Sequence, residues 1–216
     1  MQVTNILPST AVQFFSSRNL RSIFLPDVVQ HITELFSFFE SPQTADKLSL
    51  DEGLKFLMGR HQDRTIIKLE LFASGIAVQA CENTNKLTEV VLFITAELNQ
   101  KFGVDFISAA PLEFAYASTL EFQADPAFSQ FAGKFSEISS MINQKVAELG
   151  FISKGFDLGS IAFSADQQFV TPTALGMFKI ERRINHNFDE NIFYAEAPLK
   201  TNDHIEILKT LEKCFE

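Results

Sequence analysis

The densest run of side chains that could do chemistry lies between Lys179 and Glu190. Arginine binds a carboxylate or phosphate through two parallel hydrogen bonds. Arginine near aromatic rings is also typical of the residues that dominate binding energy in protein interfaces. We therefore predict a partner- or ligand-binding site on a strand end and the hairpin loop that follows it. Its residues are Glu181, Arg182, Arg183, His186 and Phe188.

A second interpretation of this run needs no ligand. Arg182 or Arg183 can pair with Asp189 or Glu190 in a solvated hairpin, and such exposed pairs contribute little to stability. A charged loop more often has this explanation than a binding role, and the sequence leaves both open.

Motifs that mark catalysis or cofactor binding are missing from the sequence. Gly155, Gly159 and Gly176 are dispersed and lack the Lys-Ser/Thr pair of a phosphate-binding loop. The chain contains no nucleophile elbow, no His-Glu-x-x-His zinc motif and no calcium-loop spacing. We therefore predict no cofactor, no metal and no catalytic residues, and we lean against an enzyme.

The histidines and cysteines are too far apart in sequence to indicate a site. His31 falls on the polar side of a predicted helix and His204 in the first turn of another, so both are expected at the surface. Cys81 and Cys214 have neither zinc nor redox spacing. Two buried free thiols in a reducing compartment are the expectation.

The composition predicts a folded, acidic protein. Its 216 residues are 46% apolar and include 24 Phe, two Tyr and no Trp. Most Phe rings belong in a core or an apolar contact surface, because they carry no polar group. The net charge of −9 disfavours nucleic-acid binding, since it repels phosphates. About half of this excess lies between Val104 and Phe178, where three lysines face eight acidic residues.

The location expected from the sequence is the cytoplasm. The N-terminus shows no basic region followed by an apolar stretch, so we predict no signal peptide. No apolar run approaches the length of a bilayer crossing, so we expect a soluble protein without a membrane partner.

The strongest structural pattern is the alternation over residues 112–122. Successive side chains of a strand point to opposite faces, so this stretch predicts a strand with one apolar side. The apolar side consists of Leu112, Phe114, Tyr116, Leu120 and Phe122.

Helical spacing recurs in five places. Pro26 begins a run that extends to Phe39. Ser49 and Glu52 form a capping box that predicts a short helix ending at Gly59. Further helices are expected from the cap region before Leu87 to Gly103, over 126–149 as an amphipathic core helix, and from 201–203 to the end, where Asp203 and Glu206 form another capping box.

The remaining segments are predicted as strands. They are Ala11–Phe15, Ser22–Leu25, a hairpin of 67–71 and 76–80, then 161–165, 169–171, 175–183 and 191–197. Strands in hairpins predict an α+β fold with a mostly antiparallel sheet and amphipathic helices on one face. We expect one domain over 1–216, with 1–103 and 104–216 as two similar strand–helix halves in an alternative organisation. The rings expected to face the core are those of Phe114, Tyr116, Phe128 and Phe135.

Two functions fit these observations best. The first is a non-catalytic protein-interaction factor of the adaptor, inhibitor or small-chaperone type, which binds another protein or itself. The second is a small-ligand-binding protein or enzyme with a pocket around Arg182, Arg183 and His186. A third and weaker hypothesis is that the acidic middle imitates nucleic acid and blocks a basic groove on a partner.

Overall fold

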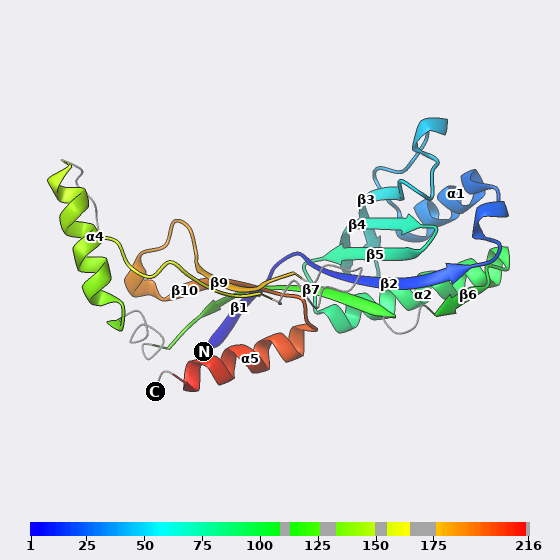
Figure 1. Cartoon of the computed structure of the whole chain (residues 1–216). Coiled ribbons are helices and arrows are strands. Elements are labelled where there is room, and N and C mark those ends of the chain that lie inside the picture. The colour runs from blue at the N-terminus through cyan, green and yellow to red at the C-terminus, as the bar shows by residue number, and fades with distance from the viewer. Residues whose placement is uncertain (109–112, 126–132, 150–154, 165–175, 215–216) are drawn as a thin grey trace. The chain divides into compact units, whose positions relative to one another are not determined.

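The structure is a computed structural model that describes residues 1–108, 113–125, 133–149, 155–164 and 176–214 (Figure 1). It has an α+β fold with ten strands in mostly antiparallel pairing, which confirms the predicted class. The strands are β1 Gln2–Ile6, β2 Ser9–Ser17, β3 Leu54–His61, β4 Arg64–Phe72, β5 Gly75–Ala80, β6 Phe106–Ser108, β7 Phe114–Gln123, β8 Ser160–Phe163, β9 Phe178–Arg182 and β10 Ile192–Ala197. The described helices are α1 Leu25–Phe36, α2 Thr84–Phe102, α4 Ser136–Glu148 and α5 Thr201–Lys213, with short 3-10 turns η1 Leu20–Ser22, η2 Ala45–Lys47 and η4 Phe188–Glu190.

The chain forms two compact units. Unit 1 contains Met1–Asn5, Leu120–Ala197 and Asp203–Glu216, and unit 2 contains Ile6–Thr119 and Pro198–Asn202. Strand β7 has residues in both units.

The strands of unit 2 follow the order β3-β4-β5-β2-β7, and β6 pairs with β2. The register places Leu69 opposite Phe56 on one side and Val78 on the other, so these three side chains share the apolar face. Their neighbours Lys68 and Gln79 are paired on the opposite face. Alternation along each strand therefore separates an apolar face from a polar one.

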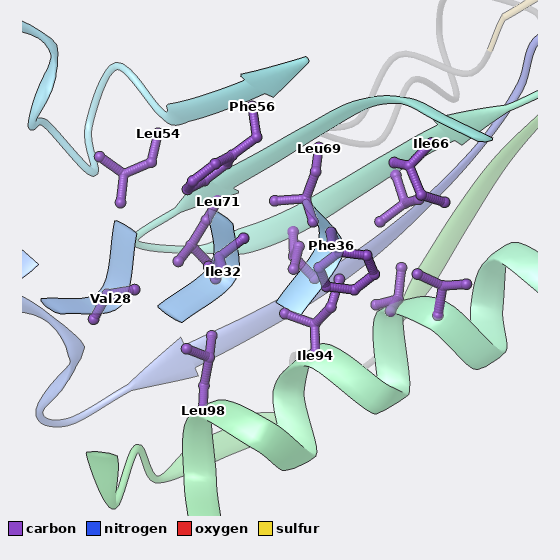
Figure 2. Packing of buried hydrophobic residues seen from close by; sticks show 14 of the residues in the cluster. Val28, Ile32, Phe36, Leu54, Phe56, Ile66, Leu69, Leu71, Ile94 and Leu98 are labelled. Carbon is purple, nitrogen blue, oxygen red and sulfur yellow. The ribbon is translucent and has the colours of Figure 1, made fainter. Parts of the chain in front are cut away.

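Helices α1 and α2 cover the apolar face of the unit 2 sheet. Figure 2 shows Ile32 and Phe36 of α1 and Ile94 of α2 pointing toward the residues of β3 and β4. Asn83 caps the N-terminus of helix α2, and its side chain accepts a hydrogen bond from the amide of Asn85. It ends at Gly103 in the left-handed conformation, as the sequence predicts. The resulting core contains 23 buried apolar residues.

The strands of unit 1 follow the order β7-β10-β9-β8. Ala195 of β10 lies opposite Ile180 of β9, and both are buried. Helix α5 contributes Leu208, which is buried, and His204, whose ring meets that of Phe178 edge-on at 5.3 Å. Eight buried apolar residues of the described chain lie in this unit.

The helix predicted from Ser49 to Gly59 is wrong, because residues 54–59 belong to β3 and the residues before them form a turn. The hydrogen bond from the Glu52 amide to Ser49 Oγ does form, but it stabilises only a turn before the strand. Gly59 does not end a helix. A Cβ atom there would lie 2.4 Å from the Phe38 ring, so glycine permits the close packing of that ring on β3.

Two further predictions fail. Residues 22–25 form the end of η1 and the start of α1 instead of a strand. The expected core helix over 126–149 is described only as α4, and none of its residues is buried. Residues 126–132, which include Phe128 and Phe131, lie outside the described part.

The strand over 112–122 is confirmed as β7. Phe114 and Tyr116 are partly buried and pack against the unit 2 core, whereas Phe135 is 37% exposed just before α4. The hairpin of β4 and β5 is confirmed, and β1 and β6 are strands that the sequence analysis did not predict. Leu112, Phe215 and the strand expected over 169–171 lie outside the described residues.

Candidate functional site

The predicted site residues lie on one short stretch of unit 1. Glu181 and Arg182 end β9, Arg183 follows, and His186 belongs to the loop that leads to β10. Asn185 has a φ of 70°, which turns the loop back. Phe188 lies in η4, and its side chain is outside the described part of the structure.

The side chain of Arg182 is largely buried and bonded to neighbouring residues. Its side chain is 10% exposed, its Nε donates to the carbonyl of Leu158 at 3.1 Å, and its Nη2 lies 3.3 Å from Asp157 Oδ2. The guanidinium also lies 5.2 Å from the ring centre of Phe193. Burial lowers the pKa of Arg182, and Asp157 opposes this change. These contacts support a structural role.

The other described residues of the predicted site each have their own partner. Arg183 Nε lies 3.0 Å from Glu121 on β7, and Glu181 lies 2.6 Å from Lys179. His186 Nδ1 lies 2.8 Å from Glu190, and its hydrogen bond holds the pKa of Glu190 below its ordinary value. The local pairing expected for the arginines thus involves His186 instead.

Two hollows are described, and both lie in unit 2. The larger has a volume of about 420 Å³ and opens beside β3. Its lining consists of Glu40, Ser41, Pro42, Asp46, Lys47, Glu52, Gly53, Lys55 and Leu57. The smaller, of about 110 Å³, lies on the polar face of the sheet and is lined by Thr10, Lys68, Glu70, Ala77 and Gln79. Neither contains a residue of the predicted site.

The expected surface positions of two histidines are wrong. His204 is completely buried, and burial lowers its pKa to about 4. The inward side of α5 runs through Thr201, His204, Leu208 and Glu212, so the buried stripe includes polar residues that a hydrophobic pattern does not reveal. His31 is only 12% exposed, because it packs edge-on against a ring of α2.

The cysteine prediction also needs correction. Cys81 and Cys214 are free, but both are exposed. Cys81 lies just after the end of β5, and Cys214 lies just after the end of α5.

In the part of the chain that the structure describes, no three His, Cys, Asp or Glu side chains gather as metal ligands. Over the same residues, no helix has the length and apolar character of a membrane span.

The described part of unit 1 carries an apolar stripe on α4. We call it the α4 surface. Its members, with their exposed fractions, are Ile138 (56%), Met141 (60%), Ile142 (41%) and Leu149 (74%), the last just after the helix. A spacing of three, four and seven residues places them on one side of a helix.

A different side of α4 holds it to its own unit. Asn143 donates from Nδ2 to the carbonyl of Phe156 at 3.3 Å and accepts a hydrogen bond from the Phe156 amide. Ser139 and Val146 on this side are partly buried. The apolar stripe therefore lies on the side of α4 next to the one that anchors the helix.

No protein-family model matches this chain, and no curated protein or solved structure is similar enough to it to count as a match.

The sequence carried a signal for the α4 surface. The helical spacing of Ile138, Ile142 and Leu149 predicts a core helix, whereas the structure exposes this stripe. The hollow beside β3 has no comparable signal, because its lining comes from separate loops and from β3, which the sequence predicts as a helix.

Proposed function

We propose that this chain is a non-catalytic protein-interaction factor, of the adaptor, inhibitor or small-chaperone type, which associates with itself through the α4 surface and presents it to partners. The observation that carries the proposal is the exposure of Ile138, Met141, Ile142 and Leu149 on one side of a helix. A contiguous exposed apolar patch is typical of a protein-interaction site.

Burial of this surface would contribute to association. Burying one such side chain contributes roughly 1.5 to 3 kcal/mol. These side chains are 41% to 74% exposed, so each contributes only part of this gain, which opposes the motional freedom lost on association. An amphipathic helix that places anchors three and four residues apart is a common recognition element.

Other features favour a protein partner over nucleic acid. The net charge of −9 opposes binding to phosphates. Ten of the fifteen large apolar side chains that are exposed in the described chain belong to unit 1. A cytoplasmic location is part of the proposal, because exposed free thiols such as Cys81 and Cys214 suit a reducing compartment.

The test compares the full chain with the double variant Ile138→Gln and Ile142→Gln. Glutamine keeps helix propensity and removes the apolar stripe. The matched control is Leu92→Gln on α2, since Leu92 is 47% exposed in unit 2. Mass is measured by light scattering over a concentration series. We expect an oligomer for the wild type and the control, and a monomer for the double variant.

A strictly monomeric wild type would contradict self-association. An oligomer that survives both substitutions would show that the α4 surface is not the contact. A fold measurement by far-UV circular dichroism accompanies each variant, so loss of the helix is distinguished from loss of the contact.

A further inference from the structure

The outer edge of β3 in unit 2 is only partly paired. The Glu40 amide donates to the Leu57 carbonyl at 3.2 Å, and the Leu57 amide donates to the Glu40 carbonyl at 2.9 Å. The Phe39 amide also donates to the Met58 carbonyl at 3.2 Å. The chain after α1 thus begins an antiparallel ladder on β3 and then leaves it.

Pro42 explains why this ladder stops. Continuing the pairing of Glu40 with Leu57 by two residues places Pro42 opposite Lys55. Proline has no amide hydrogen, so it cannot donate to the Lys55 carbonyl. Backbone groups alternate in direction along an antiparallel strand. The amide and carbonyl of Lys55 therefore face the same edge as those of Leu57, away from β4.

The larger hollow lies beside Lys55, at the place where the pairing on the edge of β3 stops. Lys55 and Leu57 of β3 form one wall, Gly53 precedes them, and Glu40 and Pro42 form the side from which the chain departs. Its volume of about 420 Å³ falls within the range of sites that hold a ligand. A backbone donor and acceptor thus face an open space.

Charged side chains surround the same space, and the charge of Lys47 acts on Asp46 in addition to a hydrogen bond from Thr44. Three carboxylates and two ammonium groups line it, and within the described residues none of the five forms an ion pair. They are Glu40, Asp46, Glu52, Lys47 and Lys55. The carboxylates outnumber the ammonium groups in a chain of net charge −9, so a ligand with positive charge is favoured.

We propose that this edge binds an extended peptide segment of a partner protein, which adds to β3 beside Lys55 and places a lysine or arginine among the carboxylates. A peptide suits the site because its backbone supplies the acceptor and donor that the Lys55 amide and carbonyl require. Addition of a strand to an exposed sheet edge is an established mode of peptide recognition. The site lies in unit 2 and does not depend on the α4 surface.

The experiment uses the full chain to select from a random library of twelve-residue peptides. We expect enriched peptides that contain lysine or arginine and lack proline at their centre. Affinities of an enriched peptide are then measured by fluorescence polarisation. Lys55→Pro removes the amide donor but keeps the pairing with β4, and we expect about tenfold weaker binding, as for one lost hydrogen bond. Lys55→Ala is the matched control, and it should bind at least as well as the wild type.

A second variant tests the proposal independently, in case Lys55→Pro does not fold. Asp46 and Glu52 are exposed, so Asp46→Asn with Glu52→Gln leaves the core intact. We expect this variant to weaken a basic peptide about tenfold at low salt. The proposal is overturned if no peptide is enriched, or if enriched peptides bind both the proline and the neutralised variants as tightly as the wild type. The double glutamine variant of α4 should retain peptide binding, which separates this site from the proposed self-association.

Discussion

The two units differ in how they use their apolar residues. Unit 2 places 23 of them in one buried cluster beneath α1 and α2 (Figure 2). In the described part of unit 1 eight are buried, while ten large apolar side chains are exposed. Apolar burial drives folding and association by the same physics. Among the described residues, unit 2 therefore buries most of its large apolar side chains, and unit 1 leaves more of them exposed.

The largest expected effect tests the core of unit 2. Phe36→Ala removes a fully buried ring that lies 5.6 Å from the ring of Phe38 and 6.3 Å from that of Phe93. We expect a loss of about 4 kcal/mol in the free energy of unfolding, because a large cavity remains. Urea denaturation measures it.

The matched control is Phe39→Ala, three residues later in the chain. Phe39 is 83% exposed, so its truncation should change stability by less than about 0.5 kcal/mol. Equal losses for Phe36→Ala and Phe39→Ala would contradict the difference between core and surface on which the comparison depends.

The next effect separates the two arginines of unit 1. Arg182→Met removes the contacts to Leu158 and Asp157 from a side chain that is 10% exposed, and should cost roughly 2 to 3 kcal/mol. Arg183→Met removes a pair with Glu121 from a side chain that is 40% exposed, and should cost about 0.5 kcal/mol. Chemical denaturation of both variants provides the comparison. If Arg183→Met were the more damaging, the structural assignment of Arg182 would be wrong.

A smaller effect depends on pH and on His204 in unit 1. Burial lowers the pKa of this histidine to about 4, so the unfolded chain binds a proton more readily than the folded one. Stability is therefore complete above the ordinary pKa and is lost as the pH falls from about 6.5 toward 4. Between pH 7 and pH 5 we expect a loss of about 2 kcal/mol from this group.

His204→Leu provides the control for the pH measurement. It removes the titrating group, so its stability should fall less between pH 7 and pH 5 than that of the wild type, by about 2 kcal/mol. Parallel pH profiles for the two proteins would show that His204 does not respond to burial as described.

Local patterns predicted much of the fold. Alternation identified β7 and the hairpin of β4 and β5, and helical spacing with Gly103 as its end identified α2. The errors arose where a local signal had two meanings. Ser49 and Glu52 form a capping interaction whether a helix or a turn follows, and the alternation of Leu54 and Phe56 was too short to decide between a helix and a strand.

The candidate sites were harder to predict. Arg182 and Arg183 are adjacent in the chain, but adjacent residues of extended backbone point to opposite sides, so Arg182 packs against Asp157 and Arg183 reaches Glu121. The hollow beside β3 depends on where the chain leaves the sheet at Pro42, which requires knowledge of strand pairing.

By itself the sequence determined which segments alternate, which have helical spacing, and that the chain is acidic and rich in phenylalanine, because these are properties of neighbouring residues. Only the tertiary structure decided which apolar stripes are covered. The same spacing buries Ile94 and Leu98 on α2 and exposes Ile138 and Ile142 on α4. Burial requires a partner surface from distant parts of the chain, and a local pattern does not contain that partner.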